Sequence, residues 1–239
     1  MGFPKPQIIA IGGASFRAEP QNLAADRYIL QQAGTRTPKV CFIPTASAEP
    51  ADSIELFTSI YTRLGAQPSV LRFFQRTPDL RETLLTQDVI YVGGGNTKSM
   101  LAVWREWGLP DVLREAWQRG IVLAGVSAGA ICWFDHGVTD SWADRLRPLE
   151  CLGFLKDTCC PHYDGEADRR PSVHAMLGER LVPPVLALND GAAAHFVGRR
   201  LHRVITWRPT GAAFQVRRGR GGVVETALPS TRLRSYRLR

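Results

Sequence analysis

Short apolar runs alternate with segments of helical periodicity through the first half of the chain. The runs are four to six residues long and cover residues 7–11, 40–43, 69–74, 88–92 and 121–125. Runs of this kind are typical of strands that are buried in a parallel sheet. Their alternation with helical segments predicts an α/β fold, with a mostly parallel sheet and helices on both faces, which is a three-layer sandwich.

The helices are expected between these strands. In residues 52–64, apolar side chains recur every three or four positions, and Gly65 follows as a stop signal. Residues 97–107 have the same spacing, and residues 110–119 begin with Pro110, in the first turn where proline is tolerated.

The C-terminal segment has a strand pattern instead. Three short strands are predicted, over residues 203–207, 214–218 and 223–228. The glycine-rich turn at residues 219–222 joins the last two into a hairpin. We therefore expect a single domain over residues 1–239 that ends in an arginine-rich β extension, residues 198–239.

Most of the positive charge lies at this end of the chain. The 239 residues carry a net charge of +8, yet residues 199–239 alone contain eleven arginines and one acidic residue. Charged side chains on an edge hairpin also protect against aggregation. A basic patch gives only non-specific affinity for nucleic acid, and no base-reading motif accompanies it, so nucleic-acid binding is not expected.

The composition, with 44% hydrophobic and 22% charged residues, is that of a compact globular protein. No apolar run approaches the roughly 20 residues of a membrane span, and the first residues lack the features of a signal peptide. We therefore expect a soluble, cytoplasmic protein with no membrane partner, and a homo-oligomer is compatible with the sequence. The five cysteines have no C-x-x-C spacing, so neither a disulfide framework nor a metal site is expected.

A serine between two glycines follows the last of the apolar runs. The sequence Gly125-Val-Ser127-Ala-Gly129 matches the nucleophile elbow, in which a sharp strand-to-helix turn exposes the serine hydroxyl. The alternative is a small residue in a tight turn. In an elbow, the N–H of Ala128 can stabilise an oxyanion, and residues 93–95, three glycines after another strand, can supply a second donor. These loops should converge, because ligands of parallel sheets bind beyond the carboxyl ends of the strands.

A serine hydroxyl needs a base to take its proton. The five candidates are His136, His162, His174, His195 and His202. His162 lies in a stretch dense in charged and turn residues, which is typical of a site loop, whereas His195 lies in an apolar run that favours a core histidine. Asp140, or Asp135 just before it, could accept a hydrogen bond from the second ring nitrogen of the base.

Three motifs occur in a fixed order along the chain. They are Tyr91-Val-Gly-Gly-Gly-Asn-Thr97, Gly125-Val-Ser-Ala-Gly-Ala130 and Cys160-Pro-His-Tyr-Asp-Gly-Glu166. Together they resemble the peptidase E family of serine peptidases, which includes the cyanophycinases, and the similarity runs from about residue 7 to residue 196. The resemblance implies the core fold of class I glutamine amidotransferases, with serine in place of their cysteine.

The resemblance also implies an activity. It is that of a serine peptidase that needs no cofactor and hydrolyses short peptides near the N-terminus, as a dipeptidase or aminopeptidase. Members named for peptidase E remove N-terminal Asp from dipeptides, so the resemblance also implies a preference for N-terminal Asp. Two other classes compete with this interpretation: an α/β esterase, which shares the elbow, and a catalytically silent binding protein on the same fold.

Roles carry over to residues that match the motifs. Ser127 matches the nucleophile, His162 the base and Asp140 the acid, and the amides of Gly94 and Ala128 match the oxyanion hole. The alternatives for the acid are Asp135, Ser141 and Glu166.

The substrate contacts implied by the resemblance come from two of the motifs. Asn96 and Glu166 lie within the motifs, and an arginine after the Gly165-Glu166 pair is implicated in gripping the substrate aspartate. Arg169 is the first choice for that arginine and Arg170 the second. Only two residues separate His162 from the Gly-Glu pair, which is shorter than in typical dipeptidases and favours a differently shaped pocket.

Overall fold

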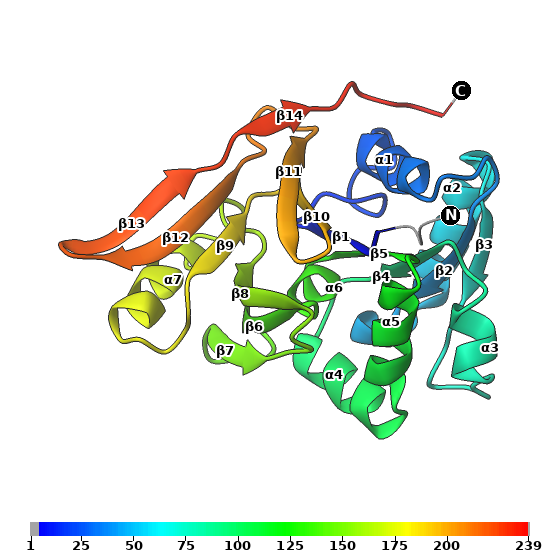
Figure 1. The fold of residues 1–239 in the computed structure, drawn as a ribbon, viewed down its shortest axis with the longest axis horizontal. Coiled ribbons are helices and arrows are strands. Elements are labelled where there is room, and N and C mark those ends of the chain that lie inside the picture. The colour runs from blue at the N-terminus through cyan, green and yellow to red at the C-terminus, as the bar shows by residue number, and fades with distance from the viewer. Residues whose placement is uncertain (1–4, 239) are drawn as a thin grey trace.

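The computed structural model describes residues 5–238 and contains two sheets with helices around them (Figure 1). The strands are β1 (Gln7–Ile11), β2 (Lys39–Ile43), β3 (Gln67–Val70), β4 (Val89–Val92), β5 (Val122–Val126), β6 (Phe134–Thr139), β7 (Arg147–Glu150), β8 (Leu155–Cys160), β9 (Val185–Leu188), β10 (Ala192–Val197), β11 (Arg200–Thr206), β12 (Ala213–Gly219), β13 (Gly222–Ala227) and β14 (Ser230–Arg232). The helices are α1 (Ala24–Gln32), the 3-10 turn η1 (Thr45–Ser47), α2 (Ala51–Arg63), α3 (Leu80–Leu84), α4 (Thr97–Glu106), α5 (Leu109–Gln118), α6 (Ala128–Ile131) and α7 (Arg169–Gly178).

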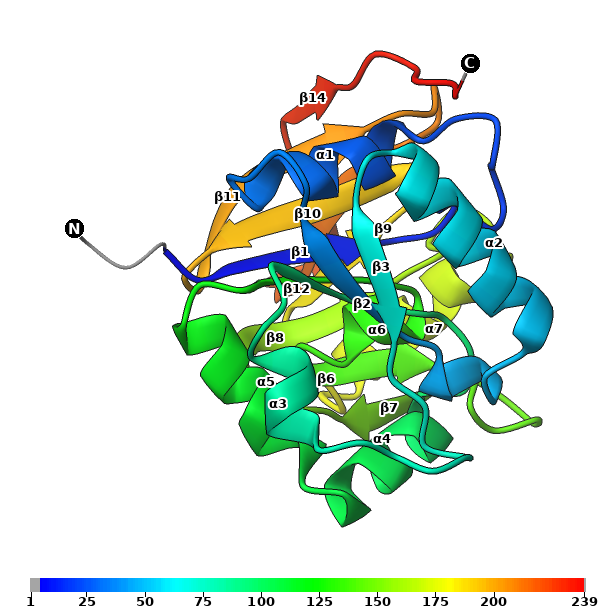
Figure 2. The same cartoon turned by 90° about the vertical axis from the view of Figure 1, so that its right-hand side faces the viewer.

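The larger sheet has eight strands in the order β14-β11-β10-β1-β5-β4-β2-β3. Its strands β1, β5, β4, β2 and β3 are parallel, and β10 joins β1 in the antiparallel direction. Helices α1 and α2 lie on one face, and α4 and α5 cover part of the other (Figure 2). The buried side chains of the two helix pairs accordingly belong to two different core clusters. The predicted α/β architecture with a parallel central sheet is therefore confirmed.

The third predicted strand ends earlier than expected. The apolar run covers residues 69–74, but β3 stops at Val70. The backbone N–H groups of Phe73 and Phe74 donate to the carboxylate of Glu49, at 2.5 and 3.4 Å, instead of to a neighbouring strand. A side-chain acceptor from a distant loop therefore overrides the strand propensity of this run.

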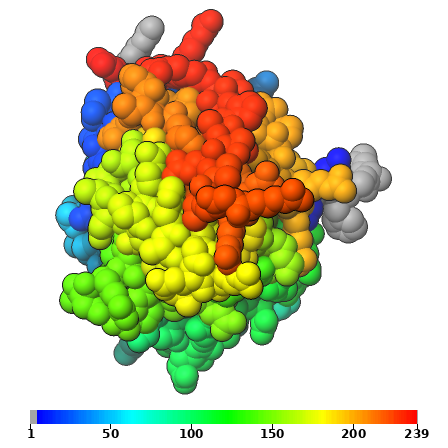
Figure 3. Space-filling view, turned by 90° about the vertical axis from the view of Figure 1, so that its left-hand side faces the viewer, coloured from blue at the N-terminus to red at the C-terminus, as the bar shows by residue number. Residues whose placement is uncertain are grey.

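The second sheet was not predicted as a separate layer. Its six strands follow the order β13-β12-β9-β8-β6-β7. The predicted C-terminal hairpin is present as β12 and β13, and β12 pairs with β9, which links the hairpin to this sheet. The hairpin projects from the body of the molecule in Figure 1 and lies against α7, as the orange-red and yellow surfaces of Figure 3 illustrate.

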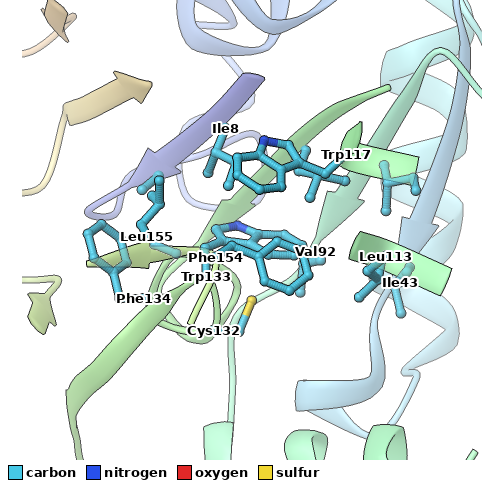
Figure 4. Close-up of a cluster of buried hydrophobic side chains, with 14 of the residues drawn as sticks. Ile8, Ile43, Val92, Leu113, Trp117, Cys132, Trp133, Phe134, Phe154 and Leu155 are labelled. Atoms are coloured by element: carbon cyan, nitrogen blue, oxygen red, sulfur yellow. The ribbon is translucent and has the colours of Figure 1, made fainter. Parts of the chain in front are cut away.

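A large aromatic core joins the two sheets. Trp133 and Phe154 pack with ring centroids 5.7 Å apart, and Trp117 of α5 stacks on Phe154 at 5.6 Å. Ile8 of β1 and Leu155 of β8 belong to the same buried cluster (Figure 4). Because protein interiors are close-packed, this core fixes the positions of β1, β5 and β8 relative to one another.

Within residues 5–238, none of the helices has both the length and the apolar character that crossing a bilayer requires.

Candidate active site

Ser127 occupies the sharp turn between β5 and α6, as the elbow pattern predicts. Its φ of 56° and ψ of −112° lie in a region that non-glycine residues rarely adopt and that often marks functional sites. The two flanking glycines are required by close packing. A Cβ on Gly125 would lie 2.2 Å from the carbonyl oxygen of Gly129, and one on Gly129 would lie 2.3 Å from that of Val92.

His162 follows β8 directly and also has a positive φ, 52°. Its backbone N–H donates to Gly12 at 3.2 Å, and that of Ser127 donates to Ile11 at 3.1 Å. Both residues are thus tied to the end of β1.

The ring of His162 is held by Asp190, which follows β9. The distance from His162 Nδ1 to Asp190 Oδ1 is 2.7 Å. The hydrogen bond with His162 lowers the pKa of the Asp190 carboxyl, and the nearby Arg208 guanidinium, 3.6 Å away, lowers it further. Since the carboxylate is ionised and can only accept, Nδ1–H donates, and Nε2 is left free to accept a proton.

The prediction that Asp140 orients the histidine is wrong, because Nδ1 is bonded to Asp190. Asp140 lies 3.5 Å from Arg169 instead. The alternatives are engaged elsewhere as well: Asp135 pairs with Lys156 at 3.4 Å, and the Ser141 hydroxyl bonds to that of Thr139 at 2.8 Å.

A sequence signal for Asp190 was present. The apolar run Val185–Leu188 is followed by Asn189-Asp190-Gly191, which is a polar turn at the end of a buried strand. It resembles the turns at Gly12 and at Gly93, and loops at the carboxyl ends of parallel strands converge.

Gly13 brings the loop after β1 against this pair. A Cβ at this position would lie 1.9 Å from Asp190 Oδ1 and 2.7 Å from His162 Nδ1. The backbone can approach the pair only because the residue has no side chain.

Gly94 lies beside the serine side chain. A Cβ on Gly94 would be 3.2 Å from Ser127 Cβ and 3.8 Å from its Oγ. The loop is anchored on both sides, because Gly93 N–H donates to Ile43 at 3.1 Å and Asn96 N–H donates to Ala46 at 2.8 Å. The amide of Ala128 follows Ser127 directly at the start of α6.

Ser127 and His162 together line two cavities. The first, which we call the glycine-loop cavity, has a volume of about 370 Å³ and is lined by Gly13, Ala14, Ser15, Phe16, Arg17, Ala18, Phe42, Ser47, Ser53, Gly93, Gly94, Gly95, Val126, Ser127 and His162. The second, which we call the acidic cavity, has a volume of about 310 Å³ and is lined by Gly95, Asn96, Ser127, Asp140, Ser141, His162 and Glu166.

Comparison with known protein families decides what kind of protein carries this site. Residues 8–204 match peptidase family S51. The chain belongs to this family. It is therefore a peptidase, as the three motifs predict.

Two curated relatives support the membership of this S51 peptidase. The "Uncharacterized peptidase YgaJ" of Bacillus subtilis (strain 168) is 46% identical over 224 residues, which make up 93% of this chain and 97% of that protein. The "Probable alpha-aspartyl dipeptidase" of Drosophila melanogaster is 32% identical over 134 residues, or 52% of this chain and 55% of that protein.

Two solved structures share the fold of the S51 peptidase. The crystal structure of a peptidase from an acI-B1 Actinobacterium has a TM-score of 0.70 at 19% identity and covers 99% of both chains. A putative peptidase E protein from Listeria monocytogenes EGD-e has a TM-score of 0.62 at 20% identity, and covers 86% of this chain and 100% of its own.

The predicted substrate residues divide into two groups. Asn96 and Glu166 line the acidic cavity. Arg169 is buried, and Arg170 lies 3.2 Å from Glu225 and over the rings of Tyr163 and Phe214. Neither arginine is among the residues that line the two cavities, and a substrate contact by Arg169 or Arg170 stays a prediction.

Proposed function

We propose that this S51 peptidase is a serine peptidase in which Ser127, His162 and Asp190 form the catalytic triad, and that it hydrolyses short peptides. The observation that carries the proposal is the shared position of Ser127 and His162 on two cavities, with the second ring nitrogen of His162 bonded to Asp190 at 2.7 Å. Nucleophile, base and orienting acid are the three parts that activation of a serine hydroxyl requires.

In the proposed reaction, Nε2 of His162 takes the proton of Ser127 Oγ as the oxygen attacks the scissile carbonyl carbon. The carbon–nitrogen bond then breaks, and the leaving amine receives that proton from His162. Water hydrolyses the resulting acyl ester by the same route and regenerates the serine. Asp190 keeps the ring oriented and stabilises the imidazolium that forms in each step.

The backbone N–H groups of Gly94 and Ala128 are the proposed donors to the oxyanion. Gly94 lies against the Ser127 side chain, and Ala128 is the residue after the nucleophile, which supplies one donor in other nucleophile elbows. Preorganised donors of this kind typically contribute about 3–4 kcal/mol each to transition-state stabilisation.

The size of the two cavities supports short substrates. Volumes of about 370 and 310 Å³ lie at the lower end of the range of typical ligand pockets, which is about 300–1,000 Å³. Action near a chain end, as a dipeptidase or aminopeptidase, fits this limit.

The order of the proposed triad argues against an α/β esterase. The order here is serine, histidine, aspartate, whereas α/β-hydrolases have the acid before the histidine. A catalytically silent binding protein on the same fold is separated from an enzyme by reaction with a fluorophosphonate, which labels only activated serines.

The test compares the wild type with Ser127→Ala on a panel of dipeptides and tripeptides. We expect cleavage by the wild type, loss of at least roughly a thousandfold in kcat for the variant, and fluorophosphonate labelling of Ser127 alone. Absence of both cleavage and labelling in the wild type would overturn the proposal.

A further inference from the structure

The acidic cavity exposes negative charge beside the reactive serine. Asp140 and Glu166 line it together with Ser127 and His162, and their side chains are 61% and 40% exposed. The other lining residues, Gly95, Asn96 and Ser141, carry no charge. A substrate group that enters this cavity therefore meets two carboxylates.

The nearest cation cannot be reached from the cavity. Arg169 has a side chain that is 2% exposed, and three acceptors surround its guanidinium. Glu166 accepts from Nε at 2.7 Å, Val138 O from Nη1 at 3.3 Å, and Asp140 lies 3.5 Å from Nη2. The two carboxylates thus stand between Arg169 and the substrate.

This arrangement makes Arg169 a positioning residue. Its charge holds Asp140 and Glu166, which come from different segments of the chain, at one place despite their mutual repulsion. One buried positive charge against two exposed negative charges leaves the cavity acidic.

The other cations near the site are directed elsewhere. Arg170 is bound to Glu225, and the ammonium of Lys98 lies over the ring of Trp142, 5.0 Å from its centroid. Arg208 pairs with Glu19 and lies 3.6 Å from Asp190. No lysine or arginine is among the described residues that line the acidic cavity, and Arg17 lines the glycine-loop cavity instead.

We propose that the acidic cavity is a specificity pocket for a basic side chain, lysine or arginine, of a residue next to the scissile bond. The inference rests on the proposed serine-peptidase function. A protonated amine or guanidinium can pair with both carboxylates without displacing Arg169, and charge-assisted hydrogen bonds are the strongest available there. An aspartate side chain that entered this cavity would meet like charge and would have to displace Glu166 to reach Arg169, so the acidic cavity disfavours aspartate at the position it accepts.

The test measures kcat/KM for dipeptides that differ only in the charge of one side chain. Lys-Ala and Ala-Lys are compared with norleucine-Ala and Ala-norleucine, which have a neutral side chain of similar length, and with Asp-Ala. All five have free termini, so terminal charges do not vary. The position at which lysine is preferred tells on which side of the bond the cavity lies.

We expect lysine to be preferred over norleucine by roughly tenfold or more at one position, which is the effect of one hydrogen bond to a charged group. Glu166→Gln and Asp140→Asn keep the acceptors for Arg169 but remove the charge, and each should reduce the lysine-to-norleucine ratio to within about threefold. Glu106→Gln, an exposed carboxylate at the end of α4, is the matched control and should keep the wild-type ratio.

The outcomes separate this inference from the proposed function. Equal turnover of lysine and norleucine substrates at both positions, or a lysine preference that survives in Glu166→Gln and Asp140→Asn, overturns the specificity pocket while the serine peptidase stands. Faster turnover of Asp-Ala than of Lys-Ala overturns it for the N-terminal position. If the wild type cleaves no peptide and Ser127 is not labelled by a fluorophosphonate, the proposed function fails, and the pocket fails with it.

Discussion

Two aspartates of this protein lie in opposite surroundings. Asp190 lies in the turn between β9 of the smaller sheet and β10 of the larger one, beside His162 and Arg208, and its pKa is lowered by the hydrogen bond with His162. Asp26 of α1 is buried between the helices and the sheet with Tyr61 as its partner, at 2.9 Å, and burial raises its pKa to about 6. The same chemical group is thus kept charged in one region and driven toward its neutral form in the other.

Two histidines, His162 and His195, show the same difference between a residue at the cavities and a residue in the core. His162 faces the cavities, whereas His195 is buried between Tyr28, at 2.7 Å, and Gln7, at 2.9 Å, as expected of a core histidine. Burial lowers the pKa of His195 to about 4. His162 differs from His195 in having an ionised carboxylate on one ring nitrogen and two cavities beside it, which the proposed role of a base requires.

The largest effect is expected from removing the charge of Asp190. Asp190→Asn keeps the shape of the side chain but no longer stabilises the imidazolium or the Nδ1–H tautomer, so kcat should fall by about 10³–10⁴. Asp135 is an alternative for the same role in the sequence, and Asp135→Asn should change kcat less than about twofold. Equal losses in both variants, measured by steady-state kinetics on one peptide, would contradict the proposed triad.

A side chain at Gly13 should disrupt the contact between Asp190 and His162 sterically. Gly13→Ala introduces a Cβ 1.9 Å from Asp190 Oδ1, which forces the carboxylate from His162, and we expect roughly a 10²–10³-fold loss of kcat/KM. Gly178→Ala is the matched control, since a Cβ there meets no atom within 4 Å. Circular dichroism should be native for both variants, and a Gly13→Ala enzyme of normal activity would exclude the close approach.

The buried Asp26 should affect the free energy of unfolding rather than the catalytic activity. The pKa of Asp26 is raised from 3.8 to about 6, so its contribution to stability is complete below pH 4 and is lost as the pH rises through 6. The free energy of unfolding should therefore lose about 2–3 kcal/mol from this group between pH 4 and 7.

Asp26→Asn removes this titration while retaining an acceptor for Tyr61. Urea unfolding at pH 4 and pH 7 should give a smaller loss of stability for the variant than for the wild type. The difference between the two proteins cancels the opposite contribution of His195, and identical pH dependence would mean that Asp26 ionises freely.

The smallest effect is expected at the boundary of the active-site region. Glu225 of β13 accepts from Tyr163, lies 2.7 Å from His174 Nε2 and lies 3.2 Å from Arg170. Glu225→Gln should cost about 1 kcal/mol in the free energy of unfolding and change kcat less than about threefold. A much larger loss of kcat would mean that the hairpin positions the neighbouring His162.

The sequence predicted the five parallel strands, the helices α2, α4 and α5 and the serine elbow because these features depend on local patterns, whereas α1 and α3 were not predicted. Apolar runs, three- and four-residue spacing and paired glycines are all contained in short segments. The acid of the proposed triad, Asp190, was not predicted because it lies 28 residues from His162 along the chain, and several aspartates nearer to His162 were chemically equivalent choices.

Arg169 illustrates the same limit. Its position after the Gly-Glu pair was readable, but its burial beneath Glu166 and Asp140 follows from the packing of α7 against the second sheet. The chain's own sequence determined that strand, turn and serine would meet at one edge of a parallel sheet, because strand direction fixes where the loops converge. Which carboxylate binds the histidine, and which ones line the cavity beside Ser127, followed from the tertiary structure alone, because these contacts depend on distances between segments that no local pattern specifies.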